Sequence, residues 1–465
     1  MQVKSIVLAV VSALTATSAL AADLTAGVPA ANIFYVGGAS AQTPGLAKTL
    51  ASFCATGAMT TYADASGKND FVFACSNAKA TSTTGVATTF TAGAKFVVVK
   101  MDEGGSFNGV GPVAVASDIS ATGYNLPTFV DITNCGTPNP AVTIASSVLG
   151  TTVNGGSCTK ETTQRHPKFG FSDVPKSIWA KRGQLLASDD ANLTQVAGFA
   201  GQGFGIVVSS ALYAALQADQ ATTGQPSISA NQYAALVQAG AAGGTVNYAV
   251  WDILLPKSAA LVAAGGSALT ATWPPAATLT LARRVATSGT QAASDVYFLN
   301  NPCEIGTSLG GGKVATAAGT YVDNGNYAST VNFIVKEESS TGGVKTDVAS
   351  GYAIGVISLE NAQSGLTGGA KFVALNGVNP VADANQKAAV LNGTYDFAYE
   401  TEMILPKGVS VPFANALVKD MGDGNNGTIA GLYTDPNNAA GALVEGETNH
   451  YSRANNACTK AVWAW

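Results

Sequence analysis

Apolar and polar positions along the chain predict units in which a strand leads through a turn into a helix. Residues 33–36 form an aromatic and β-branched run that ends at two glycines. Pro44 follows, and Leu46 and Leu50 then recur at helical spacing. Because proline suits the first position of a helix, Thr43 is a candidate N-cap. The first unit is therefore a strand followed by a helix that opens near Pro44.

Three later segments repeat this pattern. Residues 94–101 form an apolar run that leads into a glycine-rich turn. In residues 168–180, a turn that contains Asp173 precedes a proline that can open a helix. In residues 278–299, the first half has the pattern of a strand and the second half that of a helix. Four such units predict an α/β architecture with largely parallel sheets, whose ligands lie at the carboxyl ends of the strands.

Three glycine-rich regions carry weaker patterns. Residues 55–93 and 107–165 are rich in Gly, Thr, Ser and Asn, and we interpret them as loops and short strands held by disulfides. Residues 307–350 are similar, with one predicted strand in the segment TVNFIVKEE. These regions predict little about the position of a site.

The composition bounds the class of protein and argues against some partners. The chain has 465 residues, of which 47% are apolar, so it has room for about two to three domains. Charged residues make up only 11%, and the formal net charge is −5. Nucleic acids and anionic membrane surfaces demand basic patches, so neither is an expected partner. An anion would have to be held by locally placed groups.

The first residues predict export. Lys4 precedes the apolar run 6–14, and the small-x-small pattern at 19–21 predicts a signal peptide, residues 1–21, that is cleaved near Ala21. The apolar run is too short to cross a bilayer, and no later stretch reaches that length without interruption. We therefore expect a periplasmic or secreted protein without membrane insertion.

The cysteines fit an oxidising compartment. Six occur, an even number that predicts disulfides, although six cysteines allow many connectivities. Sequence proximity suggests two pairs and leaves a third: Cys54–Cys75, Cys135–Cys158 and Cys303–Cys458. Only two histidines occur and the cysteine spacings are not C-x-x-C, so we expect neither a zinc site nor another cofactor.

Several predicted helix N-termini carry residues that suit an anion. Such termini offer unpaired amide N–H groups and the positive end of a helix dipole. Arg284 adds a planar cation that fits a tetrahedral oxyanion, and Asp173 adds an acceptor, which is useful only if the anion carries a proton or if the carboxylate orients the arginine. The hydroxyls that add donors are Ser40, Thr43, Ser106, Ser288 and Thr290. The combination suits a protonated oxyanion such as hydrogen phosphate.

Simpler interpretations compete with this one. Ser288, Gly289 and Thr290 could form only a helix cap and a turn, and Thr43 and Asp173 could each cap a helix. Neighbours on a strand point to opposite faces, so either Arg283 or Arg284 should face outward, and the spacing favours Arg284 inward. These alternatives stay open at the level of the sequence.

The order of several short motifs resembles a known family. The segments GGASAQTPGLAKTL, GGSFNG, GFSDVP, RRVATSGT and GYAIGVIS occur in the order found in the phosphate-binding proteins of bacterial ABC importers. The resemblance covers islands within residues 33–405, and R-x-x-x-S-G-T is its most specific motif. It implies a type II periplasmic binding protein fold, two α/β lobes joined by two crossing strands. The family has an acid two residues after the arginine, where this chain has Ala286.

The resemblance also implies a set of ligand-binding residues and a division into lobes. In this resemblance, the backbone amides of Gln42 and Thr43 would face the anion, and Ser106 would bind it through its hydroxyl and amide. Asp173 would accept the ligand proton. The cradle would be completed by Arg284, Ser288, Gly289 and Thr290. The implied crossing strands are residues 203–210 and 352–359. Lobe 1 would comprise residues 22–208 plus 358–465, with the disulfide-bearing insertions, and lobe 2 residues 209–357, so a Cys303–Cys458 bridge would link the lobes.

Three functions follow as hypotheses. The first is a solute-binding protein that captures phosphate or a similar oxyanion between the lobes for uptake through an ABC permease. The second is a secreted or surface protein that uses the same fold as a structural or adhesive module. A hydrolase of phosphate esters ranks behind both, because the chain shows no metal-ligand cluster, no Ser-His-Asp arrangement and no G-x-S-x-G segment. We therefore expect a protein that is not an enzyme.

Overall fold

The computed structural model describes most of the chain that follows the expected signal peptide; residues 1–21 lie outside the described part. The described residues are 22–65, 70–114, 126–136, 142–144, 153–241, 250–263, 278–303, 320–327, 331–425, 429–435, 446, 448–454 and 456–464.

The strands, in chain order, are β1 (Ile33–Gly38), β2 (Met59–Asp64), β3 (Asp70–Cys75), β4 (Phe96–Met101), β5 (Val130–Cys135), β6 (Val142–Ile144), β7 (Val153–Lys160), β8 (Phe169–Ser172), β9 (Leu193–Val208), β10 (Ser227–Ile228), β11 (Leu279–Arg284), β12 (Thr320–Tyr327), β13 (Val331–Glu338), β14 (Tyr352–Ser358), β15 (Lys371–Phe372), β16 (Ala374–Leu375), β17 (Ala398–Pro406), β18 (Leu432–Thr434), β19 (Tyr451–Ser452) and β20 (Val462–Trp463).

The α-helices are α1 (Thr43–Phe53), α2 (Gly111–Ala114), α4 (Lys176–Lys181), α5 (Ala187–Asp190), α6 (Ser210–Asp219), α7 (Ala230–Ala241), α8 (Val250–Leu254), α9 (Pro256–Ala263), α10 (Gly289–Leu299), α11 (Thr341–Asp347), α12 (Ala388–Leu391) and α13 (Pro412–Asp420). The 3-10 turns are η1 (Ala30–Asn32), η2 (Ser40–Gln42), η3 (Ser106–Gly109) and η5 (Gln363–Gly365), and η6 (Met421–Asn425) is a π-helical turn.

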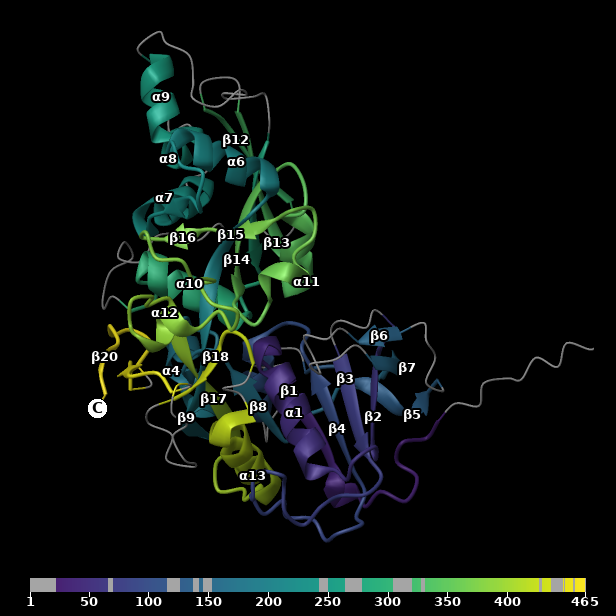
Figure 1. The fold of residues 1–465 in the computed structure, drawn as a ribbon. Coiled ribbons are helices and arrows are strands. Elements are labelled where there is room, and N and C mark those ends of the chain that lie inside the picture. The colour runs from purple at the N-terminus through teal and green to yellow at the C-terminus, as the bar shows by residue number, and fades with distance from the viewer. Residues whose placement is uncertain are drawn as a thin grey trace, which may run out of the picture.

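The fold is built around a curled β-sheet that contains both parallel and antiparallel strands, and one long strand joins its two halves. The order of its main path is β12-β13-β11-β14-β9-β17-β8-β1-β4-β3-β2-β7-β5. The first part of β9, up to Gly203, pairs with β17, whereas Phe204–Val208 pairs with β14. Figure 1 shows the consequence: β11–β14 and helices α6–α11 lie in the upper part, and β1–β8 lie below with α1 and α13.

The strands next to the predicted turns are parallel, but the sheet as a whole is not. β1 pairs in parallel with β4 and β8, and β11 pairs in parallel with β13 and β14. β2 and β3 form an antiparallel pair, and so do β12 and β13. β9 is also antiparallel to both of its neighbours on the main path, β14 and β17. The prediction of largely parallel sheets is therefore wrong for the described strands. Strands joined by a short connection, such as β12 and β13, can only pair antiparallel. The long strand β9 also runs antiparallel to β14 and β17, which come much later in the chain.

The first predicted unit folds as expected, with one difference at the helix start. β1 covers the predicted strand, and Leu46, Leu50 and Phe53 are buried on α1. Thr43 is already the first residue of α1, and no side chain caps this helix. The prediction of Thr43 as an N-cap is wrong, because η2 continues directly into the helix and places Thr43 inside it.

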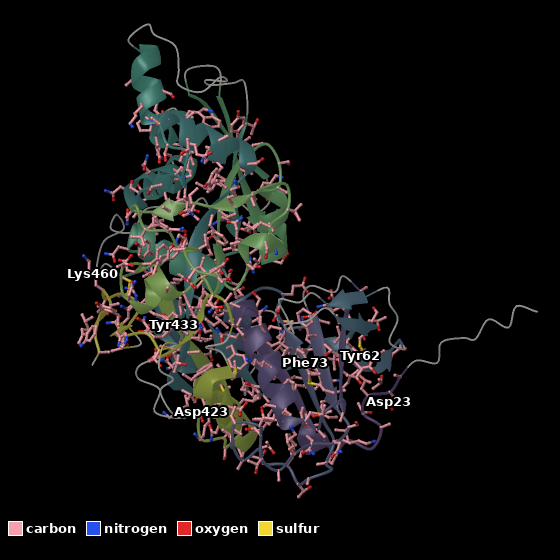
Figure 2. All side chains as sticks on the ribbon, viewed as in Figure 1. Asp23, Tyr62, Phe73, Asp423, Tyr433 and Lys460 are labelled. Atoms are coloured by element: carbon pink, nitrogen blue, oxygen red, sulfur yellow. A yellow bond between two sulfur atoms is a disulfide. The ribbon has the colours of Figure 1, made fainter. Side chains whose placement is uncertain are left out.

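Buried apolar residues form separate clusters on either side of the sheet. Tyr62 and Phe73, labelled in Figure 2, come from neighbouring strands but belong to different clusters. The cluster under α1 and α13 is aromatic: the ring of Phe413 stacks on Phe34 at 4.0 Å and lies 5.4 Å from that of Phe90. This cluster holds α13 against β1 and so supports the strand that leads to the predicted first turn.

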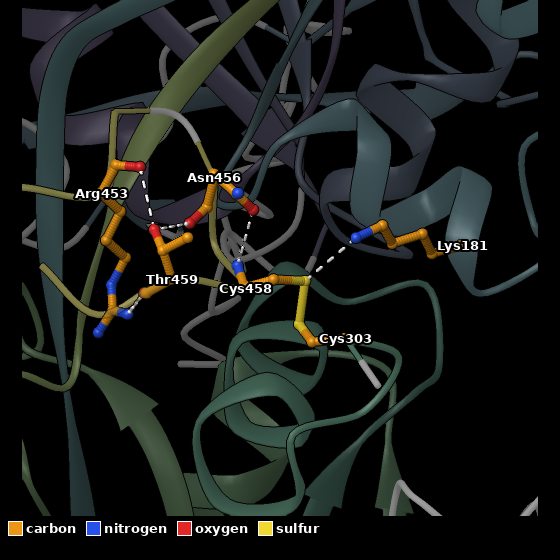
Figure 3. Close-up of a disulfide and its surroundings, with 6 residues drawn as sticks. All are labelled: Lys181, Cys303, Arg453, Asn456, Cys458 and Thr459. Atoms are coloured by element: carbon orange, nitrogen blue, oxygen red, sulfur yellow. Dashed lines mark hydrogen bonds between the residues drawn. A yellow bond between two sulfur atoms is a disulfide. The ribbon is translucent and has the colours of Figure 1, made fainter. Parts of the chain in front are cut away.

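All three expected disulfides are present. Cys54–Cys75 ties the end of α1 to β3, and Cys135–Cys158 ties β5 to β7. Cys303–Cys458, with a Cα–Cα distance of 5.2 Å, joins the residues after α10 to the C-terminal segment (Figure 3). Proximity in the sequence therefore predicted the two local pairs, and the remaining pair follows.

Replacement of the buried ring of Phe413 tests the role of the aromatic cluster. We expect Phe413→Ala to lower the free energy of unfolding by about 3–5 kcal/mol, because it removes a fully packed ring and leaves a cavity. Val409, on the preceding turn, is 55% exposed, so Val409→Ala should change the free energy of unfolding by less than about 0.5 kcal/mol. Urea unfolding monitored by circular dichroism measures both. Equal effects of the two substitutions would contradict the packing described here.

Candidate functional site

The turns after the parallel strands meet at one place. The turn after β4 lies against the turn after β11: a Cβ on Gly105 would lie 2.6 Å from the Cα of Ser288. The amide of Phe107 donates to the carbonyl of Thr287 at 2.9 Å. A Cβ on Gly289 would lie 2.2 Å from the Oγ of Ser106. Segments more than a hundred residues apart in the chain are therefore in direct backbone contact.

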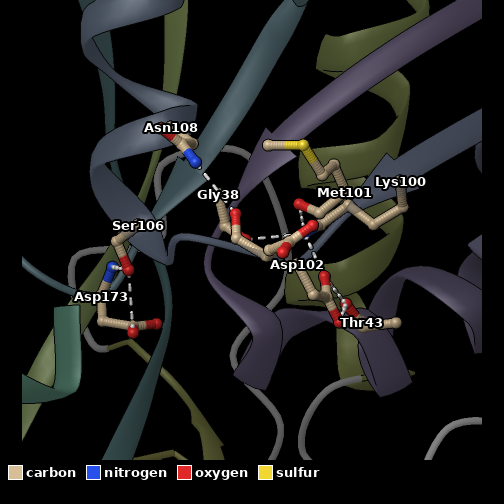
Figure 4. A network of polar contacts seen from close by, with 9 residues as sticks. Gly38, Thr43, Lys100, Met101, Asp102, Ser106, Asn108 and Asp173 are labelled. Atoms are coloured by element: carbon tan, nitrogen blue, oxygen red, sulfur yellow. Dashed lines mark hydrogen bonds and ion pairs between the residues drawn. The ribbon is translucent and has the colours of Figure 1, made fainter. Parts of the chain in front are cut away.

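Ser106 and Asp173 form a buried pair at this contact (Figure 4). The Oγ of Ser106 donates to Oδ2 of Asp173 at 2.9 Å. The other oxygen, Oδ1, is enclosed and has no hydrogen-bond partner among the described residues. The interpretation of Asp173 as a helix cap is wrong, because α4 begins after Pro175 without a side-chain cap. The acceptor is instead directed at the meeting point of the turns.

Burial shifts the acid strength of this carboxyl. Removal from water raises the pKa of Asp173 to about 6, and the hydrogen bond from Ser106 and the charges of Arg284 and Lys100 lower it in part. The charge of Asp102 adds to the increase. Asp173 is therefore a weaker acid than an exposed aspartate.

Arg284 ends β11 and points inward, as expected. Its Nη1 donates to the Oγ1 of Thr341 at 2.9 Å, its Nη2 to the carbonyl of Ser339 at 3.0 Å and its Nε to the carbonyl of Glu338 at 3.3 Å. Backbone and hydroxyl oxygens of the β13–α11 turn thus orient the guanidinium. This chain has Ala286, and therefore no carboxylate, two residues after the arginine. Burial lowers the pKa of Arg284 to about 10, and nearby carboxylates, first Asp173, oppose this effect.

The neighbouring arginine is not solvated. Arg283 is only 7% exposed and pairs with Glu337, its partner in the register of β13. One of the two arginines was expected to face outward, but both are buried in the structure. The parallel neighbour strand supplies a carboxylate that makes burial of the second charge possible.

The start of α10 combines a cap with a close contact. The Oγ of Ser288 accepts from the amide of Gln291, which is a normal N-cap. Gly289 and Thr290 are buried, and the side chain of Gln291 accepts from the amide of Arg284 at 3.1 Å. The cap interpretation of Ser288 is confirmed, and the same turn places the positive end of the helix beside Asp173.

The first turn is built differently from the expectation. The amide of Gln42 donates to the carbonyl of Ala39, which precedes η2, and the amide of Thr43 donates to the carbonyl of Ser40, so these two amides already have acceptors. The side chain of Gln42 donates to the Oγ1 of Thr401 at 3.0 Å. Both residues are buried, and their role in ligand binding stays a prediction.

A buried ion pair that sequence reasoning missed supports this turn. The Oγ1 of Thr43 donates to both oxygens of Asp102, at 2.8 and 2.9 Å. Fully buried Lys100 pairs with Asp102 and also donates to the carbonyls of Gly38 and Met101 (Figure 4). The only signal in the sequence is a lysine and an aspartate at the end of an apolar strand. Burial raises the pKa of Asp102 to about 6, and Lys100 lowers it in part.

Within the described ranges, no group of three or more His, Cys, Asp or Glu side chains is placed to hold a metal ion. None of the helices described above has the length and apolar character that a membrane crossing requires.

No protein-family model matches the chain, and no curated protein is significantly similar to it in sequence. Solved structures that are similar to parts of it include the following three. The ABC-type phosphate transport receptor from Vibrio cholerae is 14% identical with a TM-score of 0.29, over 55% of this chain and 73% of the receptor. PstS from Borrelia burgdorferi is 12% identical with a TM-score of 0.28, over 56% and 76%. A human phosphate binding apolipoprotein is 16% identical with a TM-score of 0.30, over 57% and 73%. With TM-scores this low, the function proposed below rests on the geometry of the site.

Substitution of Gly289 tests the contact between α10 and the Ser106–Asp173 pair. We expect Gly289→Ala to lower the free energy of unfolding by about 1–3 kcal/mol, because its methyl group would overlap the Ser106 hydroxyl. Gly342 in the first turn of α11 is a matched control, since its nearest neighbour would be 3.5 Å away, and Gly342→Ala should be neutral or slightly stabilising. Thermal and urea unfolding measure both. Tolerance of alanine at position 289 would show that the two turns are not in contact.

The pKa of Asp173 gives a second prediction. Its value in the folded protein, about 6, exceeds the ordinary value near 4, so its stabilising contribution is complete below about pH 4 and is lost as pH rises through 6. Asp173→Asn removes this loss. We expect the stability of the variant relative to wild type to increase by up to roughly 3 kcal/mol between pH 4 and pH 7. Urea unfolding at a series of pH values measures it, and a constant difference would contradict the burial of this carboxyl.

Proposed function

We propose that the protein is an exported solute-binding protein that captures a protonated tetrahedral oxyanion, phosphate first, between the turns after β4 and β8 and the turn after β11. The two halves of the sheet that meet at β9 would be its lobes, residues 22–208 plus 358–465 and residues 209–357. An ABC permease would then receive the ligand. The proposal does not involve catalysis.

The observation that carries this proposal is the unpartnered oxygen of Asp173. A buried polar atom without a hydrogen bond is rare and costs free energy, so it marks a place where a ligand group can bind. The hydroxyl of Ser106, the N-terminus of α10 and the charge of Arg284 lie around it. The N-terminus of α10 and the guanidinium offer donors for the charged oxygens of an anion. The hydroxyl of Ser106 holds Oδ2 of Asp173, which leaves Oδ1 as the acceptor for the hydrogen of the anion.

This combination selects among oxyanions. A helix N-terminus and a guanidinium attract any anion, sulfate included. An ionised carboxylate repels an anion without a hydrogen, because two like charges meet in a site with little water. Phosphate and arsenate retain a hydrogen near neutral pH and can donate it to Asp173. The same site would therefore reject sulfate.

Several contacts support the second candidate, a structural or adhesive module. The amides of Gln42 and Thr43 and three N–H groups of Arg284 already have protein acceptors. Gly289 lies directly on the Ser106–Asp173 pair. In this alternative the cluster only holds the two halves of the sheet together, and no small molecule binds.

Calorimetry separates the two candidates. We expect the disulfide-bonded, phosphate-stripped protein to bind phosphate and arsenate with a Kd of about 1 μM or below at pH 7 and to bind no sulfate. Arg284→Gln should weaken phosphate binding roughly 10- to 100-fold, because it removes a charge-assisted donor. Asp173→Asn should admit sulfate, because an amide can donate to an oxygen that carries no hydrogen.

The matched control is Arg165→Ala, which removes an arginine that pairs with Glu161 at the protein surface. It should bind phosphate as wild type does. Circular dichroism establishes that each variant is folded. If the wild-type protein binds none of these anions, the structural module is the better explanation.

A further inference from the structure

A second buried carboxyl oxygen lies at the same end of the sheet. Glu360 follows the end of β14, which pairs in parallel with β11, so Glu360 and Arg284 share the carboxyl ends of neighbouring strands. The residue is partly exposed, but its Oε2 atom is enclosed and has no hydrogen-bond partner among the described residues. Its Oε1 accepts from the Oγ of Ser358 at 2.8 Å and from Asn361 at 2.9 Å. The carboxyl group is therefore held on one side and unsatisfied on the other.

The charges of Glu360 and the proposed site interact. Burial raises the pKa of Glu360 to about 7, the hydrogen bond from Ser358 lowers it, the charge of Asp173 raises it and that of Lys345 on α11 lowers it. Glu360 in turn acts on the guanidinium of Arg284. Glu360, Asp173 and Arg284 thus belong to one group of interacting charges.

The balance of charge in this group constrains the ligand. The ammonium of Lys100 is engaged by Asp102 and by two carbonyls, so its charge is already compensated. Glu338 lies on the strand next to Arg284 and interacts with Lys336 as well. Lys345 acts on Glu360 alone, so Arg284 is the cation whose charge acts on both Asp173 and Glu360. A dianion would meet two carboxylates and one guanidinium, which is unfavourable in a buried site.

We infer that Glu360 is a second specificity-determining carboxyl and that the bound oxyanion complex holds two acidic hydrogens, one shared with Asp173 and one with Glu360. The inference rests on the proposed function and narrows the ligand to the doubly protonated monoanion of a phosphate-like acid. Each of the two unpartnered oxygens then gains a hydrogen bond.

Binding of such a complex takes up protons from the solvent. At pH 8 both free carboxyls are ionised, and phosphate is mostly its dianion with one hydrogen. The second hydrogen of the complex must come from the solvent, so one proton is taken up for each phosphate bound. By linkage, the affinity of the wild-type protein should fall about tenfold for each pH unit above pH 8.

Glu360→Gln removes this requirement. The glutamine amide keeps the acceptor that Ser358 and Asn361 contact, and its NH₂ group donates to an anion oxygen without a proton from the solvent. Calorimetry of phosphate binding at pH 8 in buffers of different ionisation enthalpy counts the protons taken up. We expect about one for wild type and about zero for Glu360→Gln, with a Kd that stays nearly constant from pH 8 to pH 9 in the variant.

Glu103→Gln is the matched control. Glu103 lies on the turn after β4, but its side chain is 50% exposed and pairs with Lys160. This variant should take up one proton, as wild type does. Phosphate binding without proton uptake by wild type, or equal uptake by Glu360→Gln, would overturn the inference alone. Absence of phosphate and arsenate binding by wild type would overturn the proposed function and this inference with it.

Discussion

The carboxyl group of Asp173 sets the main physical constraint on the centre of this molecule. It is buried, Ser106 satisfies one of its oxygens, and the other has no partner among the described residues. An ionised carboxylate in such a place costs several kcal/mol unless positive charge compensates it. The compensation comes from Arg284 and from the first turn of α10, which must therefore lie close by.

The sheet brings these groups together because its parallel strands end at the same edge. β1, β4 and β8 are neighbours in one half, and β11, β13 and β14 are neighbours in the other. Close approach of the turns then requires the smallest residues. Gly105 has a φ of +78° and touches Ser288, and Gly289 touches Asp173, so a side chain at either position would separate the two halves. Fold and site are thus coupled through backbone contacts as much as through side chains.

The sequence predicted those parts of this arrangement that depend on local patterns. The strands β1, β4, β8 and β11, the cap at Ser288, the inward direction of Arg284 and the local disulfides all follow from residues close together in the chain. The partners of Arg284 could not be predicted in this way, because two of them are backbone carbonyls more than fifty residues away. Lys100 and Asp102 were missed for a related reason: a lysine on a strand is normally solvated, and only the packing of β1 beside β4 encloses this one. The antiparallel additions to the sheet also depend on pairings that a single sequence does not reveal.

The disulfide between Cys303 and Cys458 restricts how the two halves of the sheet could move apart at the proposed site. Arg453 fixes the C-terminal segment to the β17 side through the carbonyls of Asp396 and Ala398, and the disulfide joins this segment to the end of α10 (Figure 3). The site lies at the other end of α10, a helix of 11 residues and about 16 Å in length. A tether at one end of a rigid helix permits rotation of the other end. Opening by such a rotation would break the hydrogen bond from the amide of Phe107 to the carbonyl of Thr287 and leave the disulfide intact. The third disulfide is therefore compatible with a site that opens, provided that the C-terminal end of α10 lies near the pivot.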